Sequence, residues 1–211
     1  YPSAKLGGDA FGYGHLRDDL YSCYLIDVAG HGAGSAMHAV AIMNQLRQKS
    51  LPNTDMAQPQ QVLGVLNELF QMEDHAGLYF TIWYGVYDQK TRQLVYASGG
   101  HHPAYILPAG GGEEIPLRTR NIMIGAMPSM NFTQASIEVP AGARMYVFSD
   151  GVFEIVDKQG RQWAIDQFIE LMKQPPVEDL GEPQRLYREM RSQVPGGTFD
   201  DDFSLVVFDF D

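Results

Sequence analysis

Four groups of aspartates stand next to apolar, strand-like segments of the chain. They lie in Gly7-Gly8-Asp9, Asp27-Val28-Ala29-Gly30-His31-Gly32, Asp150-Gly151 and Asp201-Asp202. A carboxylate at such a position is partly removed from water, and an unpaired buried charge is strongly unfavourable unless it is neutralised. No lysine or arginine adjoins any of these aspartates in the sequence. A metal cation or a basic residue from a distant segment must therefore compensate the charge.

The oxygen chemistry of these aspartates favours Mg²⁺ or Mn²⁺ over zinc or copper. Four carboxylates balance two divalent ions charge for charge. Two such ions roughly 3.5–4 Å apart acidify a water between them and stabilise the oxygens of an in-line displacement at phosphorus. The pattern therefore favours metal-dependent hydrolysis of a phosphoester. For any single Asp-Gly pair the alternative is structural, because aspartate also caps helices and ends turns.

Composition restricts the classes of protein to which the chain can belong. The 211 residues carry 15 Lys and Arg against 26 Asp and Glu, a formal charge of -11, which is the wrong sign for a nucleic-acid-binding surface. The single cysteine, Cys23, stands in an apolar stretch, as expected in a reducing compartment. No apolar run reaches the ~18 residues that span a bilayer. We expect a cytoplasmic protein that binds neither nucleic acid nor membrane.

The hydrophobic pattern predicts strands grouped before and after pairs of helices. Strands are expected over 20–28, 78–87, 93–97, 104–107, 113–117, 134–139, 144–149 and 203–208, and helices over 35–49, 62–72, 164–173 and 183–194. The apolar stripe of the first helix is placed at Met37, Val40, Ala41, Met43, Asn44 and Leu46. Short connections imply antiparallel pairing, and strict β-α-β alternation is missing. The predicted fold class is α+β with antiparallel sheets, in a single domain over 1–211.

Five motifs in a fixed order carry a family resemblance that spans nearly the whole chain. They are Gly7-Gly8-Asp9, Asp27-Val28-Ala29-Gly30-His31-Gly32, Ser98-Gly99-Gly100-His101-His102-Pro103, Phe148-Ser149-Asp150-Gly151 and Asp201-Asp202-Phe203-Ser204. By these motifs the chain resembles the metal-dependent serine/threonine protein phosphatases of type 2C, in particular the bacterial SpoIIE/RsbU branch. The resemblance implies an antiparallel β-sandwich flanked by helices on both sides (αββα), with the metal site at one edge of the sandwich.

The same resemblance implies two Mn²⁺ or Mg²⁺ ions and assigns roles to individual residues. Asp27 would bridge both metals, Val28 would offer a backbone carbonyl, and Asp9, Asp150 and Asp201 would complete the ligands, with Asp202 an outer or alternate ligand. Asp27 and Asp150 are expected to carry catalysis through a metal-activated water. His31 is a candidate general acid, and the alternative is that it fixes the loop before the following helix. His101 and His102 are expected to have a structural role in a turn, and the alternative is contact with the rim of the phosphate site.

The function implied by the resemblance is hydrolysis of phosphoserine or phosphothreonine on a regulatory protein, typically an anti-sigma-factor antagonist. The sequence starts close to Gly7-Gly8-Asp9 without an initiator Met, which agrees with an N-terminal regulatory domain in the same chain, such as a response-regulator receiver. One alternative is a non-catalytic adaptor of the phosphatase fold that binds a signalling partner. Another is a nucleotide-binding loop at residues 30–35, which fits the glycine fingerprint poorly. A homodimer is left open.

Overall fold

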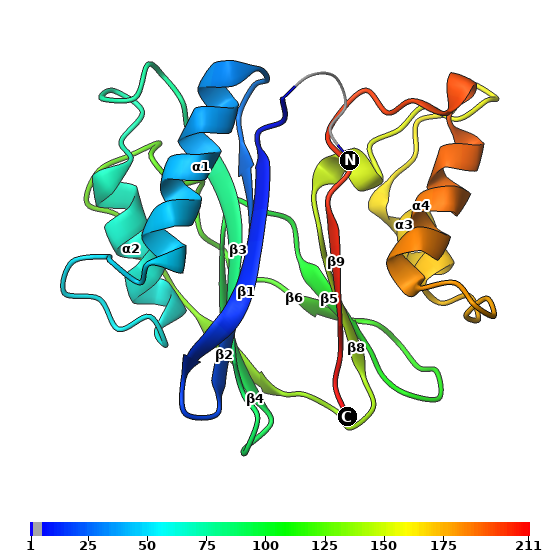
Figure 1. Ribbon diagram of the computed structural model, residues 1–211, viewed down its shortest axis with the longest axis horizontal. Coiled ribbons are helices and arrows are strands. Elements are labelled where there is room, and N and C mark those ends of the chain that lie inside the picture. Colours follow the sequence, from blue (N-terminus) through cyan, green and yellow to red (C-terminus); the bar gives the residue numbers. More distant parts are fainter. Residues whose placement is uncertain (2–5) are drawn as a thin grey trace.

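Two antiparallel sheets form the centre of the computed structural model, which describes residue 1 and residues 6–211. The elements are β1 (Asp9–Arg17), β2 (Leu20–Val28), α1 (Ala33–Arg47), α2 (Pro59–Leu69), β3 (Phe80–Asp88), β4 (Gln93–Gly99), β5 (Ala104–Leu107), β6 (Ile115–Leu117), β7 (Ala135–Glu138), β8 (Arg144–Phe148), the 3-10 helix η1 (Asp150–Val152), α3 (Ile165–Met172), α4 (Glu182–Gln193), η2 (Pro195–Gly197) and β9 (Leu205–Asp209). The strand orders are β1-β2-β3-β4-β7 and β6-β5-β8-β9. Figure 1 shows α1 and α2 outside the first sheet and α3 and α4 outside the second. The expected sandwich with helices on both sides is confirmed.

The alternation of side chains along the strands divides the interior into three apolar layers. In β2, Ile26 and Val28 face α1 and α2, whereas Cys23 and Leu25 belong to the layer between the two sheets. This division follows from the two-residue period of a strand. The third layer lies between the second sheet and helices α3 and α4 and contains Phe168. Every pair of named strands is antiparallel, which excludes the doubly wound nucleotide-binding fold.

Helix α1 buries a face that coincides with the predicted stripe only at Leu46 and, in part, at Met43. The buried positions are Ser35, His38, Ala39, Ile42 and Leu46, spaced three and four residues apart as in any helix packed on one side. Met37 and Val40, placed on the predicted apolar stripe, are 74% and 48% exposed. The prediction was wrong because the inner face carries a histidine and small residues, which have little weight in a hydrophobic pattern.

Strand β1 has no counterpart among the predicted strands. It pairs with β2 along its length at the edge of the first sheet, but its burial does not alternate and it contains two glycines. Gly12 lies over the ring of Tyr24, where a Cβ atom would come within 2.4 Å of the Tyr24 hydroxyl oxygen. This edge strand therefore has no β-branched residue and carries glycines between its aromatic residues, so the usual strand pattern is interrupted.

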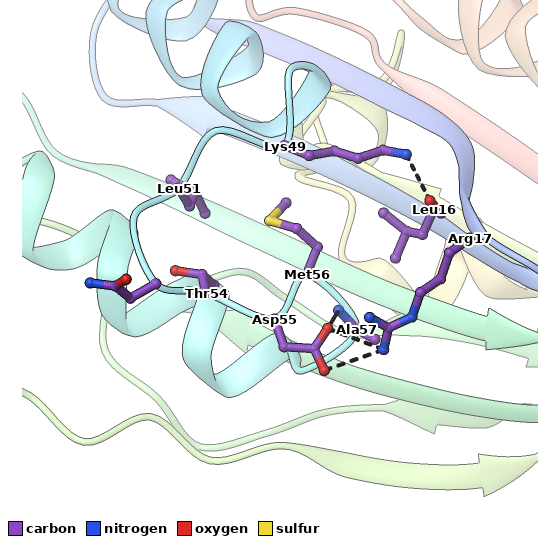
Figure 2. A pocket seen from close by; sticks show the side chains of 9 residues that line it. Leu16, Arg17, Lys49, Leu51, Thr54, Asp55, Met56 and Ala57 are labelled. Carbon is purple, nitrogen blue, oxygen red and sulfur yellow. Dashed lines mark hydrogen bonds and ion pairs between the residues drawn. The ribbon is translucent and has the colours of Figure 1, made fainter.

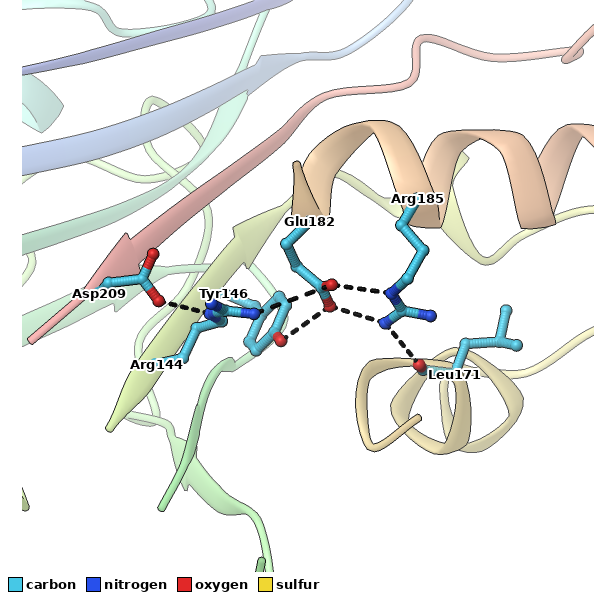
Figure 3. Close-up of polar contacts among 6 residues, drawn as sticks. All are labelled: Arg144, Tyr146, Leu171, Glu182, Arg185 and Asp209. Carbon is cyan, nitrogen blue, oxygen red and sulfur yellow. Dashed lines mark hydrogen bonds and ion pairs between the residues drawn. The ribbon is translucent and has the colours of Figure 1, made fainter. Parts of the chain in front are cut away.

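A buried ion pair attaches helix α4 to its surroundings (Figure 3). Arg185 donates to both carboxylate oxygens of Glu182, at 2.7 and 2.8 Å, and to the carbonyl of Leu171 in α3 at 2.9 Å. The Tyr146 hydroxyl of β8 donates to the same carboxylate at 3.0 Å. The two ion-pair partners are only 3% and 7% exposed. Polar contacts thus fix α4 to both α3 and the second sheet.

Candidate active site

Antiparallel pairing places Asp9, Asp27 and Thr81 in one row across three neighbouring strands. Asp27 in β2 is the partner of Asp9 in β1 on one side and of Thr81 in β3 on the other. Directly opposite residues share a face, with Cβ atoms about 4.5–5.5 Å apart. Asp27 lies on the face of β2 that carries Cys23 and Leu25, so the row stands at the end of the layer between the sheets.

The two carboxylates of this row are held in an unfavourable environment. Burial raises the pKa of Asp27 to about 8, and the charges of Asp9, Asp150, Asp201 and Asp202 add to the increase. Burial likewise raises the pKa of Asp9 to about 7, although hydrogen bonds from serine side chains oppose this shift. The Oδ2 atom of Asp9 is buried and finds no hydrogen-bond partner in the described part of the chain. A bound cation would therefore stabilise the charged forms of Asp9 and Asp27.

Asp150 and the Asp201-Asp202 pair come from the second sheet and are joined through one serine. The Ser149 hydroxyl donates to the Asp202 carbonyl at 3.0 Å and accepts from the Ser204 backbone N–H at 3.1 Å. This serine connects the end of β8 to the start of β9, so the two acidic loops are held side by side. Burial, followed by the charge of Asp201, raises the pKa of Asp150.

Glycines let the two sheets approach each other at this edge. A Cβ atom on Gly7 would lie 1.7 Å from a carboxylate oxygen of Asp202, and one on Gly151 would lie 2.3 Å from the Asp202 carbonyl oxygen. A Cβ atom on Gly8 would lie 2.5 Å from the Val28 carbonyl oxygen. The backbone N–H of Asp9 also donates to the Asp202 carboxylate at 3.4 Å. The motif glycines are therefore needed for close packing around the aspartates.

The aspartates open onto a cavity of about 510 Å³. It is lined by Gly8, Asp27, Ala29, Gly30, His31, Tyr79, Thr81, Asp150, Asp200, Asp201 and Asp202. Asp201 is exposed to this cavity, whereas Asp202 is buried. His31 reaches the rim from the loop between β2 and α1, and its ring makes no hydrogen bond with any described residue. Both roles of His31, proton donor and support of the loop, stay predictions.

Sequence reasoning missed three residues of this cavity. Tyr79 and Thr81 enter it because they precede or begin β3, which is the neighbour of β2 in the sheet. Nothing in the sequence specifies that neighbour. Asp200 was visible as part of an acidic run, but the run alone does not say which of its members face inward.

The donor set fits a hard divalent cation. Within residue 1 and residues 6–211, none of the ion pairs involves Asp9, Asp27, Asp150 or Asp201. The same residues contain no group of three or more His, Cys, Asp or Glu arranged to hold a metal ion. A metal ion here thus requires other oxygen atoms in addition, such as carbonyl or water oxygens, or a small movement of the loops.

His101 is buried and His102 is half-buried between β4 and β5, and neither lines the cavity of the aspartates. The ring of His102 packs against Phe148 and Phe153, with centroids 4.7 and 5.2 Å apart. Burial lowers the pKa of His101 to about 3 and that of His102 to about 4. Both rings are therefore neutral near pH 7, and the packing supports the structural role expected for them. Phe148 and Phe153 flank Asp150 in sequence, so this aromatic packing holds both ends of the Asp150 segment.

A second cavity, of about 540 Å³, lies beside the loop that follows α1 (Figure 2). Its charged groups are already partnered. Lys49 donates to the carbonyls of His15 and Leu16 at 2.8 and 2.9 Å, and Arg17 pairs with Asp55 at 3.3 Å. These contacts hold the loop against β1, and we assign this cavity no chemistry.

The arrangement of sheets and helices is that of the type 2C (PP2C) phosphatases. The SiaA-PP2C domain of Pseudomonas aeruginosa matches with a TM-score of 0.84 at 18% identity, over 100% of this chain and 83% of that one. The PP2C phosphatase domain of the cell fate determinant SpoIIE from Bacillus subtilis, solved with a fragment of its regulatory domain, gives a TM-score of 0.78 at 20% identity, over 97% of this chain and 58% of that one. The fold therefore defines the class as PP2C-type.

Sequence comparison narrows this class to one family. The family model described as Stage II sporulation protein E (SpoIIE) matches residues 17–211, so the chain belongs to the SpoIIE family of PP2C-type phosphatases. The phosphoserine phosphatase RsbU of Bacillus subtilis (strain 168) is 26% identical over 159 residues, covering 75% of this chain and 46% of RsbU. The phosphoserine phosphatase RsbP of the same organism is 28% identical over 156 residues, covering 72% of this chain and 38% of RsbP. This chain thus matches less than half the length of either relative.

No helix in the described part of the chain combines the length and the apolar character needed to cross a bilayer.

Proposed function

We propose that this chain is the catalytic domain of a metal-dependent protein serine/threonine phosphatase. Its substrate is phosphoserine or phosphothreonine on a regulatory protein. The observation that carries the proposal is the meeting of carboxylates from three separate segments at one cavity, with Asp9 paired to Asp27 behind them. Burial and neighbouring charges raise the pKa of Asp9, Asp27 and Asp150. The family relationship to named phosphoserine phosphatases supports it.

Two Mn²⁺ or Mg²⁺ ions would be held by Asp9, Asp27, the Val28 carbonyl, Asp150 and Asp201, with Asp202 an outer or alternate ligand. When bound, such ions supply a water of lowered pKa and positive charge for the phosphate oxygens. The chain itself holds the oxygen donors in position before the ions bind. The β-ladder holds Asp9 opposite Asp27, and Ser149 holds the loop of Asp150 against that of Asp202. Through these contacts Asp27 and Asp150 carry catalysis.

The proposed substrate protein is an anti-sigma-factor antagonist, as the resemblance of the motifs to the SpoIIE/RsbU branch implies. Because the chain covers only part of RsbU and RsbP, we also propose that this single domain works under an N-terminal regulatory domain of a longer cytoplasmic protein, such as a receiver domain. A homodimer of the longer protein is compatible with this arrangement.

The proposal is tested by hydrolysis of p-nitrophenyl phosphate with and without Mn²⁺. Turnover should require the metal and should fall at least 100-fold in Asp150→Asn, which keeps the shape of the side chain and removes a ligand charge. Asp179→Asn is the matched control, since Asp179 is an exposed aspartate far from the cavity lining. A folded chain that binds a phosphoprotein but gives no turnover at saturating Mn²⁺ would instead support the adaptor alternative.

A further inference from the structure

A groove of about 560 Å³ beside α4 is lined by positively charged residues, whereas the chain as a whole is negatively charged. Its lining comprises Tyr1, Lys158, Gln184, Tyr187, Arg188, Arg191, Ser192, Val194, Gly196 and Gly197. Three of these residues are cationic and none is acidic, although the whole chain has a formal charge of -11. We call this feature the basic groove. A local concentration of positive charge on an acidic protein indicates attraction of an anionic partner.

The cations of the basic groove are not used to hold the fold together. Lys158, Arg188 and Arg191 are exposed, and none of the three forms an ion pair with another residue that the structure describes. Their neighbour Arg185, by contrast, is buried against Glu182. Arg191 donates only its Nε–H, to the Gly197 carbonyl at 3.1 Å, which orients the side chain. Its guanidinium is thus positioned and still has donors to offer.

One wall of the basic groove is aromatic. The rings of Tyr1 and Tyr187 stack with centroids 3.9 Å apart and an angle of 16° between their planes, and Val194 is buried beside them. An aromatic wall next to guanidinium groups that form no ion pair with a described residue suits an anionic peptide segment. Arginine clusters of this kind recognise acidic and phosphorylated motifs.

The basic groove borders the acidic cavity. Gly197 in its lining is three residues before Asp200 in the cavity lining, a distance of at most about 11 Å along an extended chain. The backbones of Tyr1 and Phe203 exchange two hydrogen bonds, each 2.9 Å long, and Phe203 directly follows Asp202. In Figure 1 the N-terminus and η2 lie at the same end of the sandwich as the start of β9.

We propose that the basic groove docks an acidic segment of the phosphoprotein substrate, next to the phosphorylated residue. This inference rests on the proposed function. A phosphorylated side chain carries about -1.5 to -2 charges, so a chain of charge -11 repels it at long range. The three cations beside the cavity give that approach a local attraction, and they recognise acidic residues that flank the phosphate. The basic groove thereby contributes to KM and to the choice of substrate.

The test compares three substrates at saturating Mn²⁺: a phosphoserine peptide with acidic flanks, the same peptide with neutral flanks, and p-nitrophenyl phosphate. The variant is Arg188→Gln/Arg191→Gln. We expect kcat/KM for the acidic peptide to fall about 5- to 10-fold, through KM, while the other two substrates change less than about twofold. Arg47→Gln/Lys90→Gln removes the same net charge elsewhere on the surface and should leave all three values unchanged.

Several outcomes overturn the proposal. It fails if the unaltered chain shows no preference for acidic flanks, or if the groove variant loses equally on all three substrates. It also fails if the variant dissociates a dimer and leaves peptide KM unchanged, because the groove would then hold a second copy. If no substrate is hydrolysed at all, the proposed function fails, and the docking proposal is then tested separately. Fluorescence anisotropy of the labelled acidic peptide measures its binding to the groove variant and to the control variant. Weaker binding to the groove variant than to the control variant supports docking, and equal binding contradicts it.

Discussion

Asp9 and Asp27 face each other across an antiparallel strand pair, a position in which like charges destabilise a sheet. Burial raises the pKa of both groups, and the charge of Asp9 adds to the increase at Asp27. This arrangement is expected in a cation-binding site. The folded chain holds the carboxylate ligands close together before the cation binds, and their repulsion lowers the stability of the chain. The Asp9–Asp27 pair is therefore the clearest indication of metal binding in this chain.

Asp27→Asn is expected to stabilise the metal-free chain at alkaline pH. The pKa of Asp27 is about 8 when folded against a usual value of 3.8, so between these values the native state binds more protons than the unfolded state. The free energy of unfolding contributed by this group therefore falls as pH rises through that window. We expect a gain of about 1–2 kcal/mol at pH 9 that shrinks towards pH 4. Urea unfolding in EDTA at both pH values measures it, and a loss of stability at pH 9 would contradict the account.

His31→Gln is expected to lower kcat more for substrates with a poor leaving group than for substrates with a good one. An exposed imidazole at the rim of the cavity can protonate a serine oxygen, whereas p-nitrophenolate leaves without help. The variant should lose about 10-fold or more in kcat on a phosphoserine peptide and less than about threefold on p-nitrophenyl phosphate. Equal losses on both substrates would assign His31 to the structure of the loop.

At the scale of elements, the sequence predicted most strands and helices because their patterns are local. The predicted strand over 20–28 coincides with β2, and each of the four predicted helices has a counterpart. Two errors arise from packing against neighbouring elements. Strand β1 was missed because Gly12 makes room for Tyr24, and the buried face of α1 was misplaced because His38 points inward and Met37 does not.

The ion pair that holds α4 gives a second stability prediction. Glu182→Gln leaves the Arg185 guanidinium buried without its counter-charge, and we expect a loss of about 3 kcal/mol. Arg144→Gln removes a contact of 3.8 Å to the same carboxylate, a contact with Tyr146 and an ion pair with the exposed Asp209. It should lose less than about 1 kcal/mol, because the Arg185–Glu182 pair stays intact. Denaturant unfolding of both variants provides the comparison. Equal losses would mean that the pair does not anchor α4.

At the scale of the whole molecule, the acidic cavity forms where the two sheets meet. The Gly7–Asp9 and Asp27 segments belong to the first sheet, and the Asp150 and Asp201 segments belong to the second. The motifs allowed the four aspartates to be named from the sequence, but Thr81 and the serine bridge through Ser149 depend on strand neighbours that no local pattern encodes. A sandwich of two sheets thus assembles a site that neither sheet contains alone.

Calorimetric titration of the chain with Mn²⁺ tests the central claim most directly. We expect two Mn²⁺ ions to bind per chain. The affinity for one or both ions should fall at least 100-fold in Asp27→Asn and stay unchanged in Asp179→Asn. We also expect that Mn²⁺ raises the thermal midpoint of the unaltered chain, since a ligand that binds only the native state stabilises it. Absence of Mn²⁺ binding, or identical binding in Asp27→Asn, would contradict the claim that these aspartates form a metal centre.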